Sequence, residues 1–205
     1  MSATSPSLQA LLVLLRLRTF VALILVFAFF AVMAPNLLST ANAVIISKHV
    51  ALNAFLAIGM TFVIITGGID LSVGSIVGLC AMVAGWLVLN GVDTGLGYAV
   101  WFNTWEIVGL VMLVGVGVGW INGILITRLN VAPFIATLGT LYIARGAALL
   151  SSGGRTFPNL SGSEDMGTAS FPVIGTGSVL GLPVMVWMLI AVPLLAHSIS
   201  RRTPL

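Results

Sequence analysis

The sequence TFVIITGGIDLSVGSIVG, from Thr61 to Gly78, decides the fold of this chain. It lies in an almost wholly apolar run, from His49 to Leu89, in which Asp70 is the one charged side chain. Roughly 20 helical residues cross the hydrocarbon of a bilayer, so this run is long enough for two membrane helices. The joint between them falls at TGGID, because Gly67 and Gly68 tolerate backbone angles that end a helix.

Two polar side chains follow the glycines, and both suit the start of the second helix. We expect Asp70 or Ser72 to accept hydrogen bonds from the free N–H groups at that helix end. An acid also suits the positive end of the helix dipole. A capping role is one interpretation of Asp70, and a role in orienting helix ends along a solute path or a subunit contact is the other. The depth of Asp70 decides between them, because a charged side chain at the bilayer centre costs about 2.5–3.5 kcal/mol on insertion scales.

Composition indicates an integral membrane protein. Hydrophobic residues make up 59% of the 205 residues and charged residues 6%, against about 25% charged residues in a soluble domain. No run of basic residues indicates nucleic acid, and the single cysteine, Cys80, offers neither an internal disulfide nor a metal cluster. The sequence has no Ser/His/Asp set and no phosphate loop, so we do not expect an enzyme active site or a metal site.

The apolar segments predict an all-α, polytopic membrane protein with about six transmembrane helices, in a single domain over residues 1–205. Residues 1–18 are expected to form a cytoplasmic tail and an interfacial helix over Leu11–Leu17. The six spans are expected at Thr19–Ala34, Val50–Thr66, Leu71–Leu89, Ile107–Thr127, Val131–Leu150 and Leu182–Ile199. The longer connections between them are expected at Asn36–Ser47, Asn90–Glu106 and Ser151–Gly181. A rival topology stays open, in which the two segments around Asp70 are re-entrant half-helices that meet near the middle of the membrane.

The basic residues favour an N-terminus in the cytoplasm. In that orientation six crossings place these arginines inside: Arg16, Arg18, Arg128, Arg201 and Arg202. The outer side then holds Lys48, Arg155 and the loop acids Asp93, Glu106, Glu164 and Asp165. Cytoplasmic loops carry an excess of Lys and Arg, so the reversed topology would break this rule. The same orientation places the joint at Asp70 toward the cytoplasmic side.

Glycines recur at a spacing of four on two predicted helices. These are Gly74 and Gly78 on one helix, and Gly115, Gly119 and Gly123 on the other. Small residues at this spacing let membrane helices approach closely, so we expect helix packing there, within or between subunits. Gly74 is also expected to serve with Gly67 and Gly68 as a hinge, because hinges need residues that absorb backbone change.

Two further polar side chains lie inside predicted spans. Asn122 either forms a hydrogen bond between helices, worth about 0.6 kcal/mol on average, or faces a sugar-sized cavity. Arg145 lies well inside the fifth span, and we expect its side chain to extend outward to the far interface. Otherwise Arg145 needs a partner within the membrane, and the sequence names none.

The segments GMTFVIITGGIDLSVGSIVGL (59–79) and WINGILITRLNVAPFIATLGTLYIARGAALL (120–150) resemble the membrane permease of bacterial ribose-type ABC importers. The GGIDLSVGS core at 67–75 is specific, and the resemblance covers nearly the whole chain. It implies a multi-pass protein of the bacterial inner membrane that pairs with a second permease subunit. It also implies a periplasmic sugar-binding protein and a separate cytoplasmic ATPase subunit that binds ATP, with no cofactor on this chain. Permeases of this family are longer, so the chain is expected to be the N-terminal part of a larger permease fold and not to transport unaided.

The resemblance implies a permease subunit for a sugar or sugar alcohol, with a translocation path formed together with a second subunit. A neutral sugar needs hydrogen-bonding groups and few charges. The candidate pathway residues are Thr66, Asp70, Ser72 and Asn122. One alternative is a truncated, non-transporting scaffold or partner of a full-length permease. Another is a permease for a different small solute, such as a branched amino acid.

Overall fold

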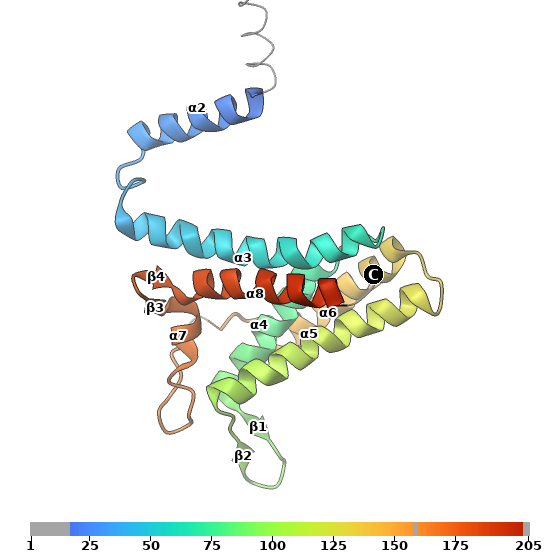
Figure 1. The fold of residues 1–205 in the computed structure, drawn as a ribbon. Helices are drawn as coiled ribbons and strands as arrows, with labels where there is room; N and C mark the ends of the chain where they lie inside the picture. The colour runs from blue at the N-terminus through green and yellow to red at the C-terminus, as the bar shows by residue number, and fades with distance from the viewer. Residues whose placement is uncertain (1–16, 158–159, 203–205) are drawn as a thin grey trace, which may run out of the picture. The chain divides into compact units, whose positions relative to one another are not determined.

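The computed structural model describes residues 17–157 and 160–202, and these residues are mainly helical (Figure 1). The helices are α2 (Arg18–Met33), α3 (Thr40–Ile65), α4 (Val73–Asn90), α5 (Thr104–Thr127), α6 (Pro133–Ser151), α7 (Phe171–Thr176) and α8 (Val184–Arg202). Two antiparallel hairpins join them: β1 (Val92–Asp93) with β2 (Ala99–Val100), and β3 (Ser178–Val179) with β4 (Leu182–Pro183). The predicted all-α class is confirmed. Residues 11–16 of the predicted interfacial helix lie outside the described residues.

Four of the described helices are long and apolar enough to cross a membrane, namely α3, α4, α5 and α6. Helix α2 and the Val184–Leu194 part of α8 are apolar but shorter. The chain is therefore a multi-pass membrane protein, with four of the six predicted spans at full length. Helices α3 and α4 have 26 and 18 residues, or about 39 and 27 Å, so each is long enough for a full crossing.

The chain divides into two units, residues 1–47 and residues 48–205, and each is described by itself. In the first unit, α2 has no buried residue, as expected of a helix that lipid surrounds. The predicted connection Asn36–Ser47 is wrong, because α3 already begins at Thr40. The Ser39 hydroxyl accepts a hydrogen bond from the backbone N–H of Asn42 (3.2 Å), which satisfies a free donor of the first turn. Lys48 and His49 therefore lie on the helix instead of in a loop.

The second unit is built around α4, which packs against α5 and α6, while α5 also contacts α6. Its apolar core consists of Ala84, Leu87 and Val88 on α4 and Ile107 on α5. Phe157 from the loop after α6 covers Gly85, where an added Cβ would lie 2.5 Å from the Phe157 ring. The glycine therefore makes room for the loop on the surface of α4.

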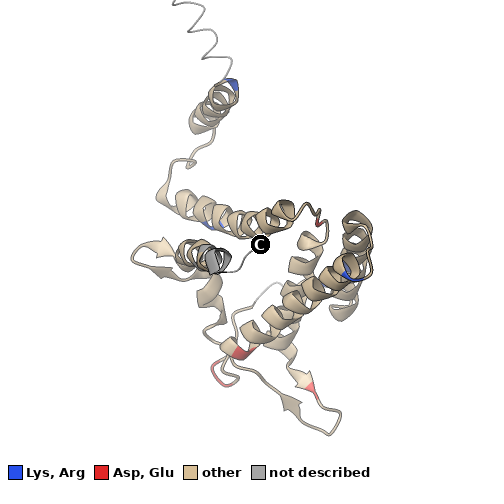
Figure 2. Cartoon of the chain, turned by 45° about the vertical axis from the view of Figure 1, so that its right-hand side comes forward, with Lys and Arg blue, Asp and Glu red and all other residues tan. Residues whose placement is uncertain are grey.

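Acidic residues gather at one end of this helix cluster, beside the β1–β2 hairpin (Figure 2). Asp93 lies on β1, and Glu106 completes a capping box with Asn103 in the first turn of α5. The loop that carries Glu164 and Asp165 reaches the same end, because the Gly167 carbonyl accepts a hydrogen bond from the backbone N–H of Thr104 (3.3 Å). Arg128 caps the other end of α5. The four loop acids and Arg128 therefore lie at opposite ends of α5.

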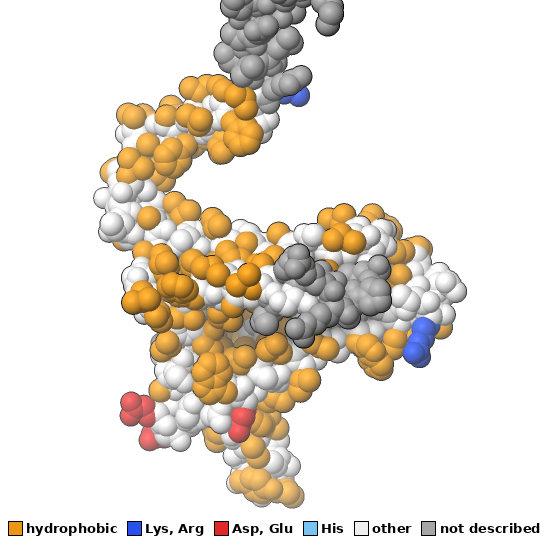
Figure 3. Space-filling view, in the orientation of Figure 1, with side chains coloured by type: hydrophobic (Ala, Val, Ile, Leu, Met, Phe, Trp, Pro, Cys, Tyr) orange, Lys and Arg blue, Asp and Glu red, His pale blue; other side chains and the backbone are white. Residues whose placement is uncertain are grey.

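The sides of the helices are largely apolar and open to the surroundings (Figure 3). On α5, for example, Met112, Leu113 and Val116 are each exposed by about two thirds (64%, 67% and 66%). Side chains of this kind suit contact with lipid, because lipid tails are as apolar as leucine.

Candidate functional site

The joint at TGGID is a helix end formed by backbone hydrogen bonds. The N–H of Gly68 donates to the carbonyl of Val63, and the N–H of Gly67 donates to the carbonyl of Ile64, both at 2.9 Å. Gly67 has a φ of +74°, which places it in the left-handed region. This pair of bonds with a left-handed glycine is a Schellman motif, which ends helices by satisfying their last carbonyls. The predicted break between the two helices is confirmed.

A row of hydrogen bonds connects the residues after this break to α5 and α6. The Asp70 carboxylate accepts from the backbone N–H of Ser72 (2.8 Å) and also from the Ser72 hydroxyl. The Asn122 side-chain amide donates to the Ser72 hydroxyl over 3.1 Å. The Thr140 hydroxyl on α6 in turn donates to the side-chain oxygen of Asn122. We call these four residues the polar row.

The polar row lies largely out of contact with the surroundings. The exposed fractions of Ser72, Asn122 and Thr140 are 0%, 5% and 8%, and that of Asp70 is intermediate. Buried polar groups are costly unless they are hydrogen-bonded, and each member of the row has a partner. A second hydrogen bond beside the polar row connects α6 to the break. The buried Thr137 hydroxyl lies 3.3 Å from the Ile69 carbonyl, and it also lies 2.8 Å from the Pro133 carbonyl of its own helix.

A cavity of about 320 Å³ opens beside the polar row. Its walls come from the break, from α5 and from the start of α6. The lining includes Thr66, Gly67, Gly68, Asp70, Gly119, Asn122, Gly123, Thr127 and Thr137. Asp70 is the one acidic residue of this lining, and no basic residue contributes to it. We call it the Asp70 cavity; it offers hydroxyl, amide and carboxylate groups to a small polar molecule.

The capping role expected for Ser72 is wrong, because Ser72 occupies the N-cap position of α4 but its side chain makes no capping hydrogen bond. Asp70 does accept a backbone N–H at the helix start, that of Ser72 itself. The Ser72 hydroxyl is instead bonded to the Asp70 carboxylate and the Asn122 amide. Thr66 lines the Asp70 cavity, although its hydroxyl donates to carbonyls of its own helix, at Phe62 and Val63.

The glycines with a predicted role lie in three different settings. Gly67 and Gly68 form the break, whereas Gly74 lies in the first turn of the regular helix α4. An added Cβ at Gly74, Gly78, Gly119 or Gly123 would meet no atom within 4 Å in the described part of the chain. Gly115 lies against Cys80, where an added Cβ would be in ordinary contact with the sulfur at 3.6 Å. Contact with a second subunit at the other glycines stays a prediction.

Sequence reasoning brought Asp70, Ser72 and Asn122 into one group but did not assign their partners on α6. Thr137 and Thr140 complete the arrangement, and both are buried. The spacing of the two threonines could have indicated this role, because residues three apart lie on the same face of a helix. Two threonines on the inward face of an apolar span indicate hydrogen-bond partners on a neighbouring helix.

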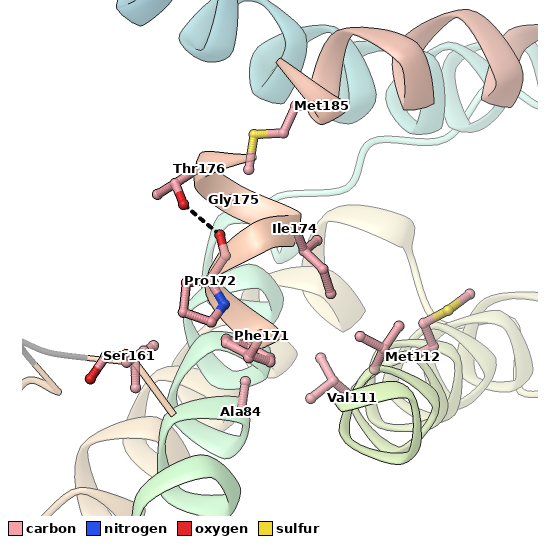
Figure 4. A pocket seen from close by; sticks show the side chains of 12 residues that line it. Ala84, Val111, Met112, Ser161, Phe171, Pro172, Ile174, Gly175, Thr176 and Met185 are labelled. Atoms are coloured by element: carbon pink, nitrogen blue, oxygen red, sulfur yellow. Dashed lines mark hydrogen bonds between the residues drawn. The ribbon is translucent and has the colours of Figure 1, made fainter. Parts of the chain in front are cut away.

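A larger cavity, of about 620 Å³, has a different character (Figure 4). It lies between α4, α5 and the segment that leads into α8, and Phe171, Ile174, Met112 and Met185 are among its apolar walls. The hydroxyl of Thr176 points back to the Pro172 carbonyl, 2.7 Å away (Figure 4). A space with so few free polar groups does not suit a hydroxylated solute, so the Asp70 cavity is the candidate site.

A family model described as "Branched-chain amino acid transport system / permease component" matches residues 42–205. The chain belongs to this permease family. The match includes the break, the polar row and all residues that line the Asp70 cavity.

Relatives of this permease chain include importers of two kinds of small molecule. The ribose import permease protein RbsC of Haemophilus influenzae is 35% identical over 192 residues, which are 94% of this chain and 55% of that protein. RbsC of Bacillus subtilis is 33% identical with the same coverage. The autoinducer 2 import system permease protein LsrC of Yersinia enterocolitica is 36% identical over 85% of this chain and 45% of that protein. The chain thus spans about half the length of these relatives, and the resemblance to ribose-type permeases is confirmed. No solved structure matches the chain.

Proposed function

We propose that this chain forms part of the membrane path of an ATP-driven importer for a sugar or a related hydroxylated small molecule. One observation carries the proposal. The Asp70 cavity lies beside uncharged hydrogen-bonding side chains of α5 and α6. Sugar hydroxyls both donate and accept hydrogen bonds, so hydroxyl and amide side chains suit them. The names of the relatives, ribose and autoinducer 2 import permeases, support the same class of solute.

The importer would consist of this permease, a second permease subunit, a periplasmic binding protein and a cytoplasmic ATPase. ATP would bind to the ATPase subunit, and the permease would need no cofactor of its own. The binding protein would dock on the connections between α4 and α5 and between α6 and α8. Closure of the ATPase would then move α3 relative to α4 about Gly67 and Gly68, where the helix has already ended. Gly74 would contribute as a further flexible point.

The orientation proposed is that of an inner-membrane protein with its N-terminus in the cytoplasm. The acids Asp93, Glu106, Glu164 and Asp165 lie at one end of the helix cluster and Arg128 lies at the other. Because basic residues concentrate on the cytoplasmic side, the end with Arg128 would face the cytoplasm. The acidic end would then face the periplasm and the binding protein.

A branched-chain amino acid is the alternative solute, because the family description names it. A zwitterion presents an ammonium and a carboxylate, and each needs an oppositely charged or strongly dipolar partner. The Asp70 cavity offers one acidic side chain and no basic one, so a neutral sugar suits it better. A non-transporting scaffold is the other alternative, and it would leave solute uptake independent of the cavity residues.

Uptake of radiolabelled solute tests the proposal directly. The importer that contains this chain would be assembled in vesicles with its ATPase and binding protein, and uptake of ribose and of leucine would be compared with and without ATP. We expect ATP-dependent uptake of the sugar and none of leucine. Leucine uptake alone would establish the amino-acid alternative, and uptake that does not require this chain would establish the scaffold.

A further inference from the structure

Arg145 lies in the interior of an apolar span. It is the thirteenth of the 19 residues of α6, so it lies about 18 Å along a helix of about 28 Å. Arginine within a membrane helix is rare and almost always faces a protein interior or a water-filled cavity, where it marks a path for a solute or an ion. The surroundings of its guanidinium group therefore call for a functional explanation.

The side chain of Arg145 lines a cavity of about 420 Å³ between α4 and α6. The opposite wall is formed by Gly74, Ser75 and Gly78 on α4. Helix side chains lean toward the helix N-terminus. The N-terminus of α6 lies beside the start of α4, because Thr137 contacts the Ile69 carbonyl. Arg145 is exposed in the described part of the chain, and it lines this cavity together with Leu141 and Ala148 of the same helix. An extension of its side chain to the far interface stays a prediction.

The residues that line this cavity favour a ligand rich in hydrogen-bond acceptors. Arg145 supplies up to five N–H donors, and the half-buried Ser75 supplies a hydroxyl. Among the described residues no acidic one lines the cavity, so none of their side chains neutralises the guanidinium group or attracts a cation there. The glycines leave the backbone of α4 open, and the volume lies within the 300–1,000 Å³ typical of small-molecule sites.

This cavity and the Asp70 cavity lie on either side of the polar row along α6. Thr137 lines the Asp70 cavity, Thr140 belongs to the polar row, and Leu141 and Arg145 line the cavity between α4 and α6. On the other side, Asp70 lines the first cavity, and the second is lined by Leu71 before the start of α4 and by Gly74, Ser75 and Gly78 on α4. The two cavities therefore follow one another along α6, with Thr140 of the polar row between them.

We propose that Arg145 and Ser75 form a second solute site within the membrane, which binds the hydroxyl oxygens of a sugar-like molecule before that molecule reaches the polar row. The inference rests on the proposed function, because it names a further contact of the same solute. The guanidinium group donates to the oxygens, and the small residues of α4 give the solute room. An uncharged solute leaves the charge of Arg145 in place, so the cavity stays hydrated between transport events.

Cysteine labelling at position 75 tests the site without relying on uptake. The native Cys80 is replaced in a C80A background, and S75C is exposed to an anionic and a cationic methanethiosulfonate reagent in membranes that contain the assembled importer. We expect labelling of S75C, faster by at least ~10-fold with the anionic reagent, because Arg145 attracts the negative charge. Ribose at millimolar concentration should slow the reaction. V116C, on the two-thirds exposed lipid-facing side of α5, is the control and should stay unlabelled.

Variants of Arg145 test the second site independently of the proposed transport function. R145Q should abolish the preference for the anionic reagent, and R145K should retain it, at equal amounts of inserted protein. An unlabelled S75C, equal rates for both reagents, or labelling that ribose does not slow would overturn the second site, even if the wild-type importer takes up sugar. Protection by leucine instead of ribose would overturn the proposed solute class as well.

Discussion

The side-chain amide of Asn122 on α5 donates a hydrogen bond to the hydroxyl of Ser72, 3.1 Å away, at the residue that precedes α4. The two residues are 50 positions apart in the sequence. Both are buried, and the Asn122 side chain is also bonded to Thr140 on α6. One amide therefore joins three helices at the level of the break.

Replacing Asn122 tests the contribution of this junction to stability. N122A leaves the Thr140 hydroxyl without its acceptor, and we expect a loss of about 0.6–1.7 kcal/mol in the free energy of unfolding, the range for interhelical hydrogen bonds. Unfolding by SDS in detergent micelles measures it. T127V is the matched control, because the Thr127 hydroxyl bonds only to the Gly123 carbonyl of its own helix among the described residues. Equal losses for both variants would contradict an interhelical role.

Neutralising Asp70 distinguishes the effect of its charge from the effect of its hydrogen bonds. D70N keeps an oxygen that accepts from the backbone N–H of Ser72, so the turn is retained while the charge is removed. We expect solute uptake to fall several-fold with little change in the amount of protein in the membrane fraction. D93N, in the exposed β1–β2 hairpin, is the control for insertion and should leave the amount of protein in the membrane fraction unchanged. If D70N reduces uptake and insertion equally, Asp70 is a structural residue only.

The left-handed backbone of Gly67 predicts sensitivity to any side chain. G67A places a Cβ on a residue with a φ of +74°, and a left-handed conformation costs about 1–2 kcal/mol for a residue other than glycine. G59A is the control within the same helix, because its Cβ would meet no atom within 4 Å and alanine favours a helix. The free energy of unfolding should fall for G67A and stay level or rise for G59A. A G67A protein as stable as the wild type would mean that the break adopts another geometry.

The contact between Gly85 and Phe157 predicts coupling between α4 and the loop after α6. G85A should push the Phe157 ring away, since the added Cβ would lie 2.5 Å from it, and the loop should loosen. Trypsin cleavage after the exposed Arg155 measures this loosening, and we expect it to be several-fold faster. In a double-mutant cycle G85A should add little to F157A, because the clash no longer exists. Additive effects of the two substitutions would rule out a direct contact.

The proposed orientation predicts which cysteines a membrane-impermeant maleimide reaches in intact cells. In the C80A background, T94C in the β1–β2 hairpin should react with cells intact, whereas N130C between α5 and α6 should react only after permeabilisation. Asn130 is exposed in the structure, and Thr94 is half-buried at the tip of the hairpin. The reverse pattern would invert the topology and place the acidic end in the cytoplasm.

The sequence allowed the break to be predicted because its cause is local. Two glycines can end a helix whatever surrounds them, and the structure has the end at Ile65, within one residue of the expected position. The start of α3 was not predicted, since Ser39 and Asn42 read as loop residues although their hydrogen bond caps the helix. Lys48 added to this error, because a basic residue suggests a boundary of the membrane.

The partners of the candidate site could be predicted only in part. Ser72 and Asn122 are polar residues in apolar spans, which marks them individually, but their pairing depends on how α5 packs against α4. The capping prediction for Ser72 was wrong, because its hydroxyl is hydrogen-bonded to Asp70 and Asn122 and not to the first turn of α4. The four-residue spacing likewise indicated that Gly78 and Gly119 lie on helix faces of small residues. It does not indicate which surface packs against those faces.

Because Asp70 can only accept hydrogen bonds when ionised, it imposes one direction on every group behind it. Ser72 must point its proton at the carboxylate, which turns a lone pair toward the Asn122 nitrogen and leaves the amide oxygen to receive the proton of Thr140. The single negative charge of Asp70 thus sets the polarity of three further side chains, those of Ser72, of Asn122 on α5 and of Thr140 on α6.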